Sequence, residues 1–426
     1  MNMRLPQPAP AVPARTASLI ERETRVVAHN YAPLPVMLAH GAGEWLTDVD
    51  GSRYLDLMSA YSAVSHGHAH PRLVRALTTQ AQRLAVTSRA FHAEPLAPFV
   101  EKLVEVSGLG AGSQVLPGSG GAESVETAIK AARRWGYRCK GIAPGRAKII
   151  VADGNFHGRT TTIVGCSSDA AYRADFGPFA PGFDMVPFGD IEALATAITP
   201  DTCAVLLEPI QGEAGIVVPP PGYLAAVRRL CDEADVLLIL DEIQSGLARS
   251  GRWFACQHED VVPDGLIVGK ALGGGLLPVS AFVGRAELMQ VFDPGSHGST
   301  FGGNPLAAAV ALEALHVIED ERLVERSAEL GAHLLARLQR VADGCEWVRA
   351  VRGRGLWVGV ELDRAIGART VVERLMARGV LTKDTHGTVI RFAPPLTIAR
   401  EALDIGIDAF EAVLEELAPA AATAYP

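Results

Sequence analysis

Short apolar runs bounded by turn residues alternate with stretches of helical periodicity through the middle of the chain. Apolar runs of this length fit strands that are buried on both faces of a parallel sheet. They predict strands in KIIVAD, CAVLLE, VLLILDE and GLIVG, with helices over residues 122–137 and in PGYLAAVRRLCDEA. This alternation predicts an α/β fold with a mainly parallel sheet between helices.

The flanking regions follow a different pattern. GEWLTDVDGSRYLDL predicts two strands joined at a turn over Asp50 and Gly51. After Pro305 come long helical patterns over 306–319 and 322–342, then short strands in WVRAVRG, GLWVGVEL, VLTKDT and VIRFAP, and a last helix over 398–417. We therefore expect four parts: an unstructured tail (1–18), a segment packing with the small domain (19–55), a large domain (56–310) and a smaller α+β domain (311–426).

Composition narrows the class of protein. The 426 residues are 48% hydrophobic and 20% charged, which is ordinary for a globular enzyme. A net charge of −9 without a basic run argues against binding to nucleic acid. No apolar stretch reaches the roughly 18 residues of a membrane span. The six scattered cysteines form no CxxC pair, which predicts reduced thiols and a cytoplasmic location.

Candidate chemistry gathers where two predicted strands end. Val236–Leu240 is followed by Asp241, and Leu266–Val268 by Gly269 and Lys270. In open α/β sheets, ligands bind beyond the carboxyl ends of the strands. A lysine that forms a Schiff base and an aspartate that binds the pyridinium nitrogen are the equipment of pyridoxal phosphate (PLP) catalysis. We therefore predict a PLP enzyme with Lys270 and Asp241 as catalytic residues.

A phosphate group needs backbone N–H donors, usually at a helix N-terminus that small residues precede. LPGSGGAESVETAIKAARRWG supplies them around Gly120, Gly121 and Ala122, although such loops are commonly only turns. Thr300 in HGSTFGGNP is a second candidate, although alone it would be taken as part of a polar loop. Gln244 is a candidate donor to the ring hydroxyl oxygen, and Phe156 in GNFHGRT is a candidate to stack on the ring.

Two arginines at strand edges are candidates to bind substrate. Arg159 and Arg391 could each hold a carboxylate through two hydrogen bonds. Glu208 and Glu213 in EPIQGEAG are further candidate site residues. Glu213 could neutralise one of the two arginines when the bound end of the substrate is not an anion.

Three histidines in HGHAH, His66, His68 and His70, look like a metal site at first sight. This spacing places them on one face only in a strand, whereas His70–Pro71 is typical of the start of a helix. We therefore predict no metal.

Together, these segments resemble the class III (fold type I) PLP aminotransferases, in order from about residue 20 to 415. The resemblance rests on SGGAESVETAIKAARRWG, GNFHGRT, EPIQGEAGIVVPPPGYL, DEIQSGLARSGRW, GKALGGGLLPVSA, HGSTFGGNP and IRFAPP. It implies a large domain with a mainly parallel sheet of the seven-stranded type, a smaller C-terminal domain, PLP as cofactor, and a homodimer with a shared active site.

Within the class, the chain is most similar to the ornithine aminotransferases. Tyr31 in AHNYAPLPV and Tyr61 in SAYSAVSHGH resemble their substrate-binding tyrosines. The likeness implies transfer of the δ-amino group of ornithine to 2-oxoglutarate, giving glutamate and glutamate 5-semialdehyde, which cyclises to 1-pyrroline-5-carboxylate. Alternatives are an aminotransferase for acetylornithine, lysine or 4-aminobutyrate, a PLP racemase or epimerase and, least favoured, a binding protein.

The resemblance also implies roles for single residues. Lys270 would form the Schiff base, Asp241 would bind the pyridinium nitrogen, Gln244 the ring hydroxyl, and Phe156 would stack on the ring. Gly121 and Ala122 would bind the phosphate together with Thr300 of the partner subunit. Ornithine would be held by Tyr31 and Arg159, and Glu213 would mask Arg391 until 2-oxoglutarate binds. One departure is Gly120, where the family commonly carries Ser or Thr; Ser119 could substitute.

Overall fold

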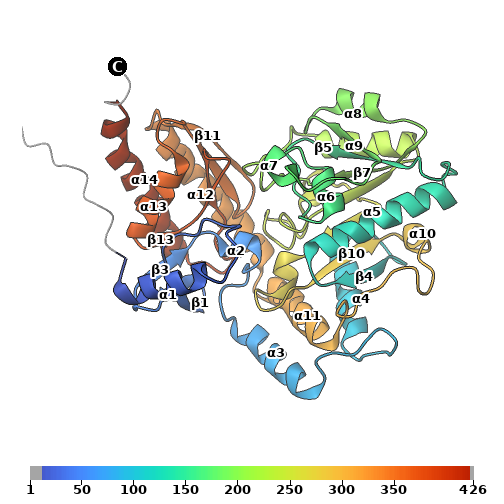
Figure 1. The fold of residues 1–426 in the computed structure, drawn as a ribbon, viewed down its shortest axis with the longest axis horizontal. Helices are drawn as coiled ribbons and strands as arrows, with labels where there is room; N and C mark the ends of the chain where they lie inside the picture. Colours follow the sequence, from blue (N-terminus) through green and yellow to red (C-terminus); the bar gives the residue numbers. More distant parts are fainter. Residues whose placement is uncertain (1–11, 423–426) are drawn as a thin grey trace, which may run out of the picture.

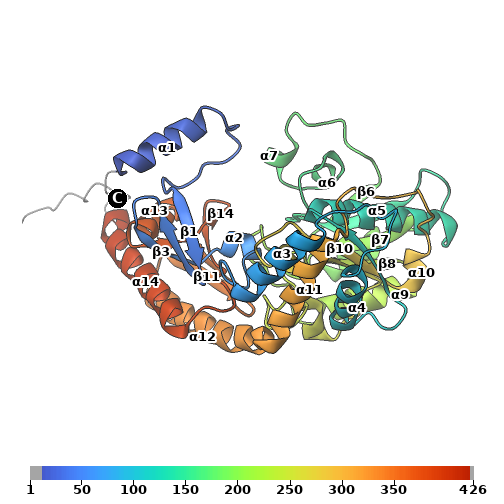
Figure 2. The same cartoon turned by 90° about the horizontal axis from the view of Figure 1, so that it is seen from below.

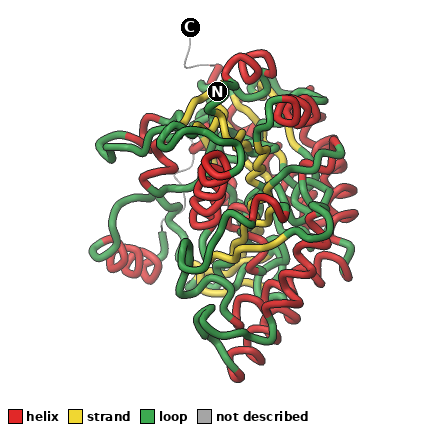
Figure 3. The backbone as a smooth tube through the Cα atoms, turned by 90° about the vertical axis from the view of Figure 1, so that its right-hand side faces the viewer, coloured by secondary structure: helices red, strands yellow, loops and turns green. Residues whose placement is uncertain are grey.

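The computed structural model describes residues 12–422. A seven-stranded sheet forms the centre of its larger part (Figures 1 and 3). Strand β10 runs antiparallel to both neighbours, while the other adjacent pairs are parallel, as predicted. The strands lie in the order β4 (Gln114–Gly118), β10 (Ser280–Gly284), β9 (Gly265–Val268), β8 (Leu237–Asp241), β7 (Thr202–Leu207), β5 (Lys148–Ala152) and β6 (Phe183–Val186).

Both faces of this sheet are buried, because alternate residues of each strand enter different hydrophobic cores. Ile239 of β8, Ile267 of β9 and Leu206 of β7 belong to the core that includes helix α5 (Gly121–Arg138). Leu238 and Leu240 face the opposite core, which includes α9 (Tyr223–Glu233) and α11 (Pro305–Asp320). Burial on both sides explains why these strands are continuous apolar runs rather than alternating ones.

Two smaller sheets occupy the other part of the molecule. One is antiparallel, in the order β11 (Val348–Gly353), β12 (Val358–Leu362), β15 (Val389–Phe392) and β14 (Asp384–Thr385). The other joins N-terminal strands to the C-terminal part, in the order β1 (Leu38–Ala42), β2 (Trp45–Asp48), β3 (Arg53–Asp56) and β13 (Val380–Leu381). Figure 1 shows these blue strands beside the red helices. The hairpin predicted at Asp50 and Gly51 joins β2 to β3.

The long helical patterns after Pro305 are confirmed as α11, α12 (Leu323–Asp343) and α14 (Arg400–Ala422). The remaining helices of the described chain are α1 (Ala14–Thr24), α2 (Ser59–Ser62), α3 (Pro71–Arg83), α4 (Leu96–Ser107), α6 (Thr161–Gly165), α7 (Ala170–Arg173), α8 (Ile191–Ala197), α10 (Ala286–Met289), α13 (Ala368–Ala377), and the 3₁₀ helices η1 (Ala255–Glu259) and η2 (Lys270–Gly273). Within residues 12–422, none of the helices has the length and apolar character needed to cross a membrane.

The unstructured tail expected over residues 1–18 is wrong in part. Helix α1 (Ala14–Thr24) begins inside it, and residues 1–11 lie outside the described chain. The guanidinium of Arg15 donates to the carbonyl of Val49 at 2.7 Å, and the Thr16 hydroxyl donates to the Asp50 carboxylate. These contacts tie the helix to the β2–β3 turn, and a reading of local sequence does not detect them. Figure 2 shows α1 at the outer edge of the part of the molecule that contains the two smaller sheets.

Candidate active site

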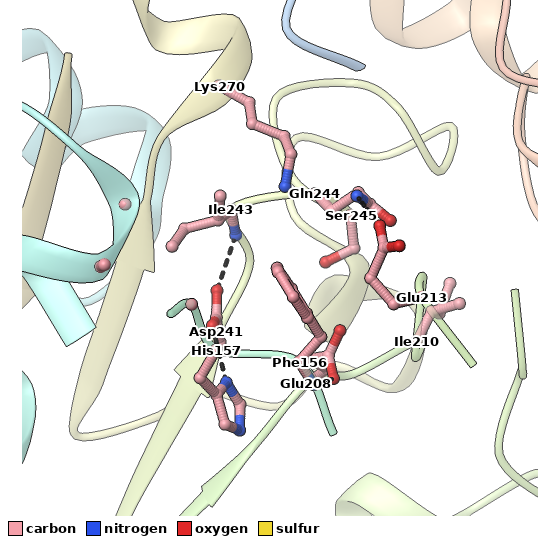
Figure 4. Close-up of a pocket in the computed structure, with 13 residues that line it drawn as sticks. Phe156, His157, Glu208, Ile210, Glu213, Asp241, Ile243, Gln244, Ser245 and Lys270 are labelled. Atoms are coloured by element: carbon pink, nitrogen blue, oxygen red, sulfur yellow. Dashed lines mark hydrogen bonds and ion pairs between the residues drawn. The ribbon is translucent and has the colours of Figure 1, made fainter. Parts of the chain in front are cut away.

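Lys270 and Asp241 lie at the ends of two neighbouring parallel strands. Asp241 is the last residue of β8, and Lys270 follows β9 after Gly269. Lys270 has φ +45°, which is uncommon for a residue other than glycine. Both side chains line a cavity of about 240 Å³ (Figure 4), together with Gly121, Ala122, Phe156, His157, Gly158, Glu208, Ile210, Glu213, Ile243, Gln244 and Ser245.

Burial is the main influence on the Lys270 amine. It lowers the pKa of Lys270, and the nearby Glu213, Asp241 and Glu208 carboxylates only partly oppose this effect. No ion pair to this amine is found among the described residues. A buried lysine with a lowered pKa is competent as a nucleophile and as a proton carrier.

Asp241 is held rigidly from two sides. Its Oδ2 lies 2.8 Å from Nδ1 of His157, and its Oδ1 accepts a hydrogen bond from the Ile243 backbone N–H at 3.1 Å. Burial alone would lower the pKa of His157, but its hydrogen bond to Asp241 and the Asp241 charge raise it overall. Sequence reasoning did not identify His157 as the residue that orients Asp241, because nothing local indicates a contact across 84 positions.

The glycine-rich loop leads into α5 as predicted. Gly121 and Ala122 line the cavity, while Gly120 is the N-cap and makes no side-chain cap hydrogen bond. A Cβ on Gly121 would come within 2.9 Å of the terminal Cδ1 methyl of Ile243, so glycine at this position lets the Ile243 side chain pack against the loop. The Gly120 carbonyl instead accepts a hydrogen bond from Ser280 Oγ at 2.7 Å, which fixes the loop. An uncapped helix N-terminus offers N–H donors to an anion.

Two acidic residues hold neighbouring parts of the cavity wall. The Phe156 backbone N–H donates to Glu208 Oε2 at 2.9 Å. Burial raises the pKa of Glu208 to about 7. Gln244 Nε2 donates to Glu213 Oε1 at 3.2 Å, whereas the buried Gln244 Oε1 has no partner among the described residues.

Glu213 forms a two-point ion pair with Arg391. The two guanidinium nitrogens lie 2.9 Å and 2.8 Å from the two carboxylate oxygens. Burial would raise the pKa of Glu213, but the charge and hydrogen bond of Arg391 lower it overall. Arg391 also donates to the Gly212 carbonyl at 3.1 Å. The pair therefore neutralises Arg391 at the wall of the Lys270 cavity.

Tyr31 and Tyr61 line a second cavity of about 490 Å³. Arg391 lines neither cavity but contacts the wall of each: it pairs with Glu213 of the Lys270 cavity, and its guanidinium carbon lies 5.8 Å from the ring centroid of Tyr61. Tyr61 belongs to α2, in which four consecutive residues, Ser59 to Ser62, have φ between 42° and 71°. Left-handed backbone costs about 1–2 kcal/mol for each L-residue. Other contacts must therefore hold this turn.

Four predicted site residues line neither cavity: Gly120, Arg159, Thr300 and Arg391. Arg159 is exposed, and its guanidinium carbon lies 3.7 Å from the Tyr172 ring centroid and 5.4 Å from that of Phe156. Thr300 is exposed in a loop after α10. Tyr172 was missed by the sequence analysis, although its edge contact with Phe156 places it beside the site.

The three histidines of HGHAH have separate partners. His66 lies 3.0 Å from the Ala314 carbonyl, His68 lies 2.7 Å from Asp56, and His70 lies 3.1 Å from Glu321. Over residues 12–422, no group of three or more His, Cys, Asp or Glu side chains could hold a metal ion.

Comparison with known proteins settles the family. The family model for class III aminotransferases matches residues 26–414. The chain belongs to the class III aminotransferases. Enzymes of this class use PLP. A buried amine, a fixed carboxylate, a Gln244 oxygen without a partner in residues 12–422 and an uncapped helix N-terminus fit this phosphorylated pyridine.

Relatives and solved structures agree with this family. An ornithine aminotransferase from an Exiguobacterium species is 53% identical over 408 residues, covering 96% of this chain and 99% of the relative. The ornithine aminotransferase of Toxoplasma gondii, described as holding PLP at partial occupancy, has a TM-score of 0.93 at 42% identity and covers 95% of each chain. An acetylornithine aminotransferase from Elizabethkingia anophelis has a TM-score of 0.85 at 43% identity, covering 94% and 99%. Fold alone therefore does not distinguish these two substrates.

Proposed function

We propose that this protein is an ornithine aminotransferase. It would transfer the δ-amino group of L-ornithine to 2-oxoglutarate, giving glutamate and glutamate 5-semialdehyde, which cyclises to 1-pyrroline-5-carboxylate. The observation that carries this proposal is the Glu213–Arg391 ion pair at the wall of the Lys270 cavity.

The ion pair matters because the two substrates differ beside their reacting carbon. Ornithine has only methylene groups next to its Cδ, whereas 2-oxoglutarate has a carboxylate next to its keto carbon. A free arginine would repel the ornithine ammonium group but would bind the 2-oxoglutarate carboxylate through two hydrogen bonds. A carboxylate that masks Arg391 in one half-reaction and releases it in the other suits both substrates.

The residues of the Lys270 cavity would bind the cofactor and transfer the proton. Lys270 would anchor PLP covalently, Asp241 would keep a proton on the ring nitrogen, and Phe156 would stack on the ring. Gly121 and Ala122 would bind its phosphate through backbone N–H groups. When bound, PLP withdraws electrons from the carbon that carries the amino group and so weakens the C–H bond. Lys270, once displaced by substrate, would take the proton from ornithine Cδ.

The far end of ornithine would be held outside this cavity. Tyr31 and Arg159 would bind the α-amino-acid group, which leaves the δ-amine as the one that reaches Lys270. Tyr61 would line the path between them, since it lies between the second cavity and Arg391.

A homodimer is part of the same proposal. Thr300 is exposed and lies outside the cavities of its own chain, so it would bind phosphate in the active site of the partner subunit. A cytoplasmic location is inferred from the six unpaired cysteines.

The test is a comparison of amino donors. Purified protein with PLP and 2-oxoglutarate would be offered ornithine, N-acetylornithine, lysine and 4-aminobutyrate at equal concentrations, with 1-pyrroline-5-carboxylate and glutamate measured. We expect kcat/KM to be largest for ornithine. A larger value for N-acetylornithine would transfer the proposal to the acetylornithine enzymes, and activity without any keto acid would favour a racemase.

A further inference from the structure

The left-handed turn Ser59–Ser62 is a feature that the proposed function does not by itself explain. Each of its four residues has positive φ, although none is glycine, asparagine or aspartate. Residues of this kind rarely adopt the left-handed conformation consecutively. Strain of this kind persists only where surrounding contacts impose it, and it concentrates at functional sites.

The contacts that impose the conformation are found at the start of the turn. Asp56 Oδ1 accepts hydrogen bonds from the backbone N–H groups of Met58 and Ser59, both at 2.8 Å. The other oxygen of Asp56 lies 2.7 Å from His68 Nε2. This gives His68, of the HGHAH run, a role in supporting the turn.

Ser59 connects the turn to the strand that carries Arg391. Its hydroxyl is fully buried and donates to the Ala393 carbonyl at 2.6 Å, two residues beyond Arg391. The Ala393 N–H donates back to the Leu57 carbonyl at 2.8 Å. Residues 57–59 are therefore bonded to the end of β15, and the Tyr61 ring is set at a defined distance from Arg391.

The buried guanidinium of Arg249 also contacts the region where the left-handed turn meets the end of β15. Arg249 is fully buried and donates to Ser65 Oγ at 2.9 Å and to the carbonyls of Pro394 and Leu356 at 2.6 Å and 2.8 Å. Since Arg249 follows the loop that carries Gln244 and begins after Asp241 at the end of β8, Arg249 connects the turn and β15 to that loop.

We infer that Ser59 is a positioning residue, which holds the left-handed turn so that Tyr61 faces Arg391 and shapes the ornithine end of the site. This inference rests on the proposed function. It goes beyond it by assigning substrate selection to a residue that lines neither cavity.

The test is a double-mutant cycle in the holoenzyme, with Ser59→Ala, Tyr61→Ala and both together. Loss of a buried hydrogen bond that leaves a carbonyl unpaired should raise KM for ornithine about tenfold. We expect kcat and KM for 2-oxoglutarate to change less than about twofold, because Arg391 is held by its own strand β15 and by the Gly212 carbonyl. In the Tyr61→Ala background, Ser59→Ala should add almost nothing, because its effect passes through Tyr61.

Ser62→Ala is the matched control, because Ser62 lies in the same turn and its buried hydroxyl has no partner among the described residues. It should leave KM for ornithine unchanged. Ser59→Gly accepts positive φ without strain and gives the same measurement if Ser59→Ala folds poorly. Additive effects of Ser59 and Tyr61, or an unchanged KM in both Ser59 variants, would overturn the inference. Failure of the wild type to use ornithine would instead overturn the proposed function.

Discussion

The two cavities on either side of the Arg391–Tyr61 contact are built in different ways. The Lys270 cavity is smaller, about 240 Å³ against about 490 Å³, and its wall carries four ionisable groups besides Lys270: His157, Glu208, Glu213 and Asp241. The second cavity is lined mainly by apolar side chains from residues 31–68 and 369–383. The first thus has the groups needed for proton transfer, whereas the second has the shape needed to select a substrate.

This difference between the cavities predicts which kinetic constants a substitution in each of them should change. Changes in the Lys270 cavity should remove turnover with every amino donor. Changes in the second cavity should alter KM and the choice of donor while leaving the chemistry in place. Glu213, which lines the Lys270 cavity, and its partner Arg391, which contacts Tyr61 of the second cavity, should affect one half-reaction more than the other.

The largest effect is expected for Lys270→Ala. Loss of the amine removes both the covalent anchor and the proton carrier, so kcat for ornithine should fall about 10⁴-fold or more. Single-turnover and steady-state assays would measure this. Lys148→Ala, in a half-exposed ion pair with Asp184, is the control and should keep full activity. Retained transamination in Lys270→Ala would exclude this lysine as the catalytic residue.

Glu213→Gln should act on one substrate only. The unmasked Arg391 would repel the ornithine ammonium group, so kcat/KM for ornithine should fall about 30-fold or more, since removing one partner of a buried charge pair costs at least about 2 kcal/mol. The half-reaction with glutamate, measured by stopped-flow absorbance, should change little. Glu361→Gln breaks an ion pair with Arg352 outside both cavities and serves as the control. Equal losses in both half-reactions would argue against masking.

The same variant tests the charge state of Glu213. Because Arg391 lowers the pKa of Glu213 in the folded protein, ionised Glu213 stabilises the fold above the ordinary glutamate pKa. That contribution disappears as pH falls through the lowered value. The difference in Tm between wild type and Glu213→Gln should therefore be constant near neutral pH and narrow in acid. A gap that stays constant throughout the acid range would contradict this ion pair.

The sequence predicted the first cavity better than the second. Asp241 and Lys270 end apolar runs, and parallel strands bring such ends together, so their position follows from local pattern. Nothing in Ser-Ala-Tyr-Ser indicates a left-handed turn, because the turn depends on Asp56 and on Ala393, which lies 334 positions from Ser59. Helix α1 was missed for the same reason, since its partners lie in a distant hairpin.

Tyr31→Phe tests the second cavity directly. If the Tyr31 hydroxyl binds the α-amino-acid end as proposed, its loss should raise KM for ornithine about 3- to 10-fold, with kcat retained. The ratio of kcat/KM for ornithine to that for 4-aminobutyrate, which has no α-amino group, should fall by the same factor. Tyr137→Phe, on α5 outside both cavities, is the control. An unchanged ratio would remove Tyr31 from the specificity argument.

The smallest expected effect concerns the one departure from the family pattern. A Cβ on Gly120 would meet nothing within 4 Å, and the residue has φ −92°, so a serine fits without strain. A hydroxyl at this N-cap would add one donor near the phosphate, and Gly120→Ser should tighten PLP binding about fivefold, or roughly 1 kcal/mol. Gly120→Ala controls for the added Cβ and should leave the PLP Kd unchanged. If both variants bind PLP equally well, the gain does not come from the hydroxyl, and Ser280 Oγ, which already fixes the Gly120 carbonyl, is sufficient to hold this loop.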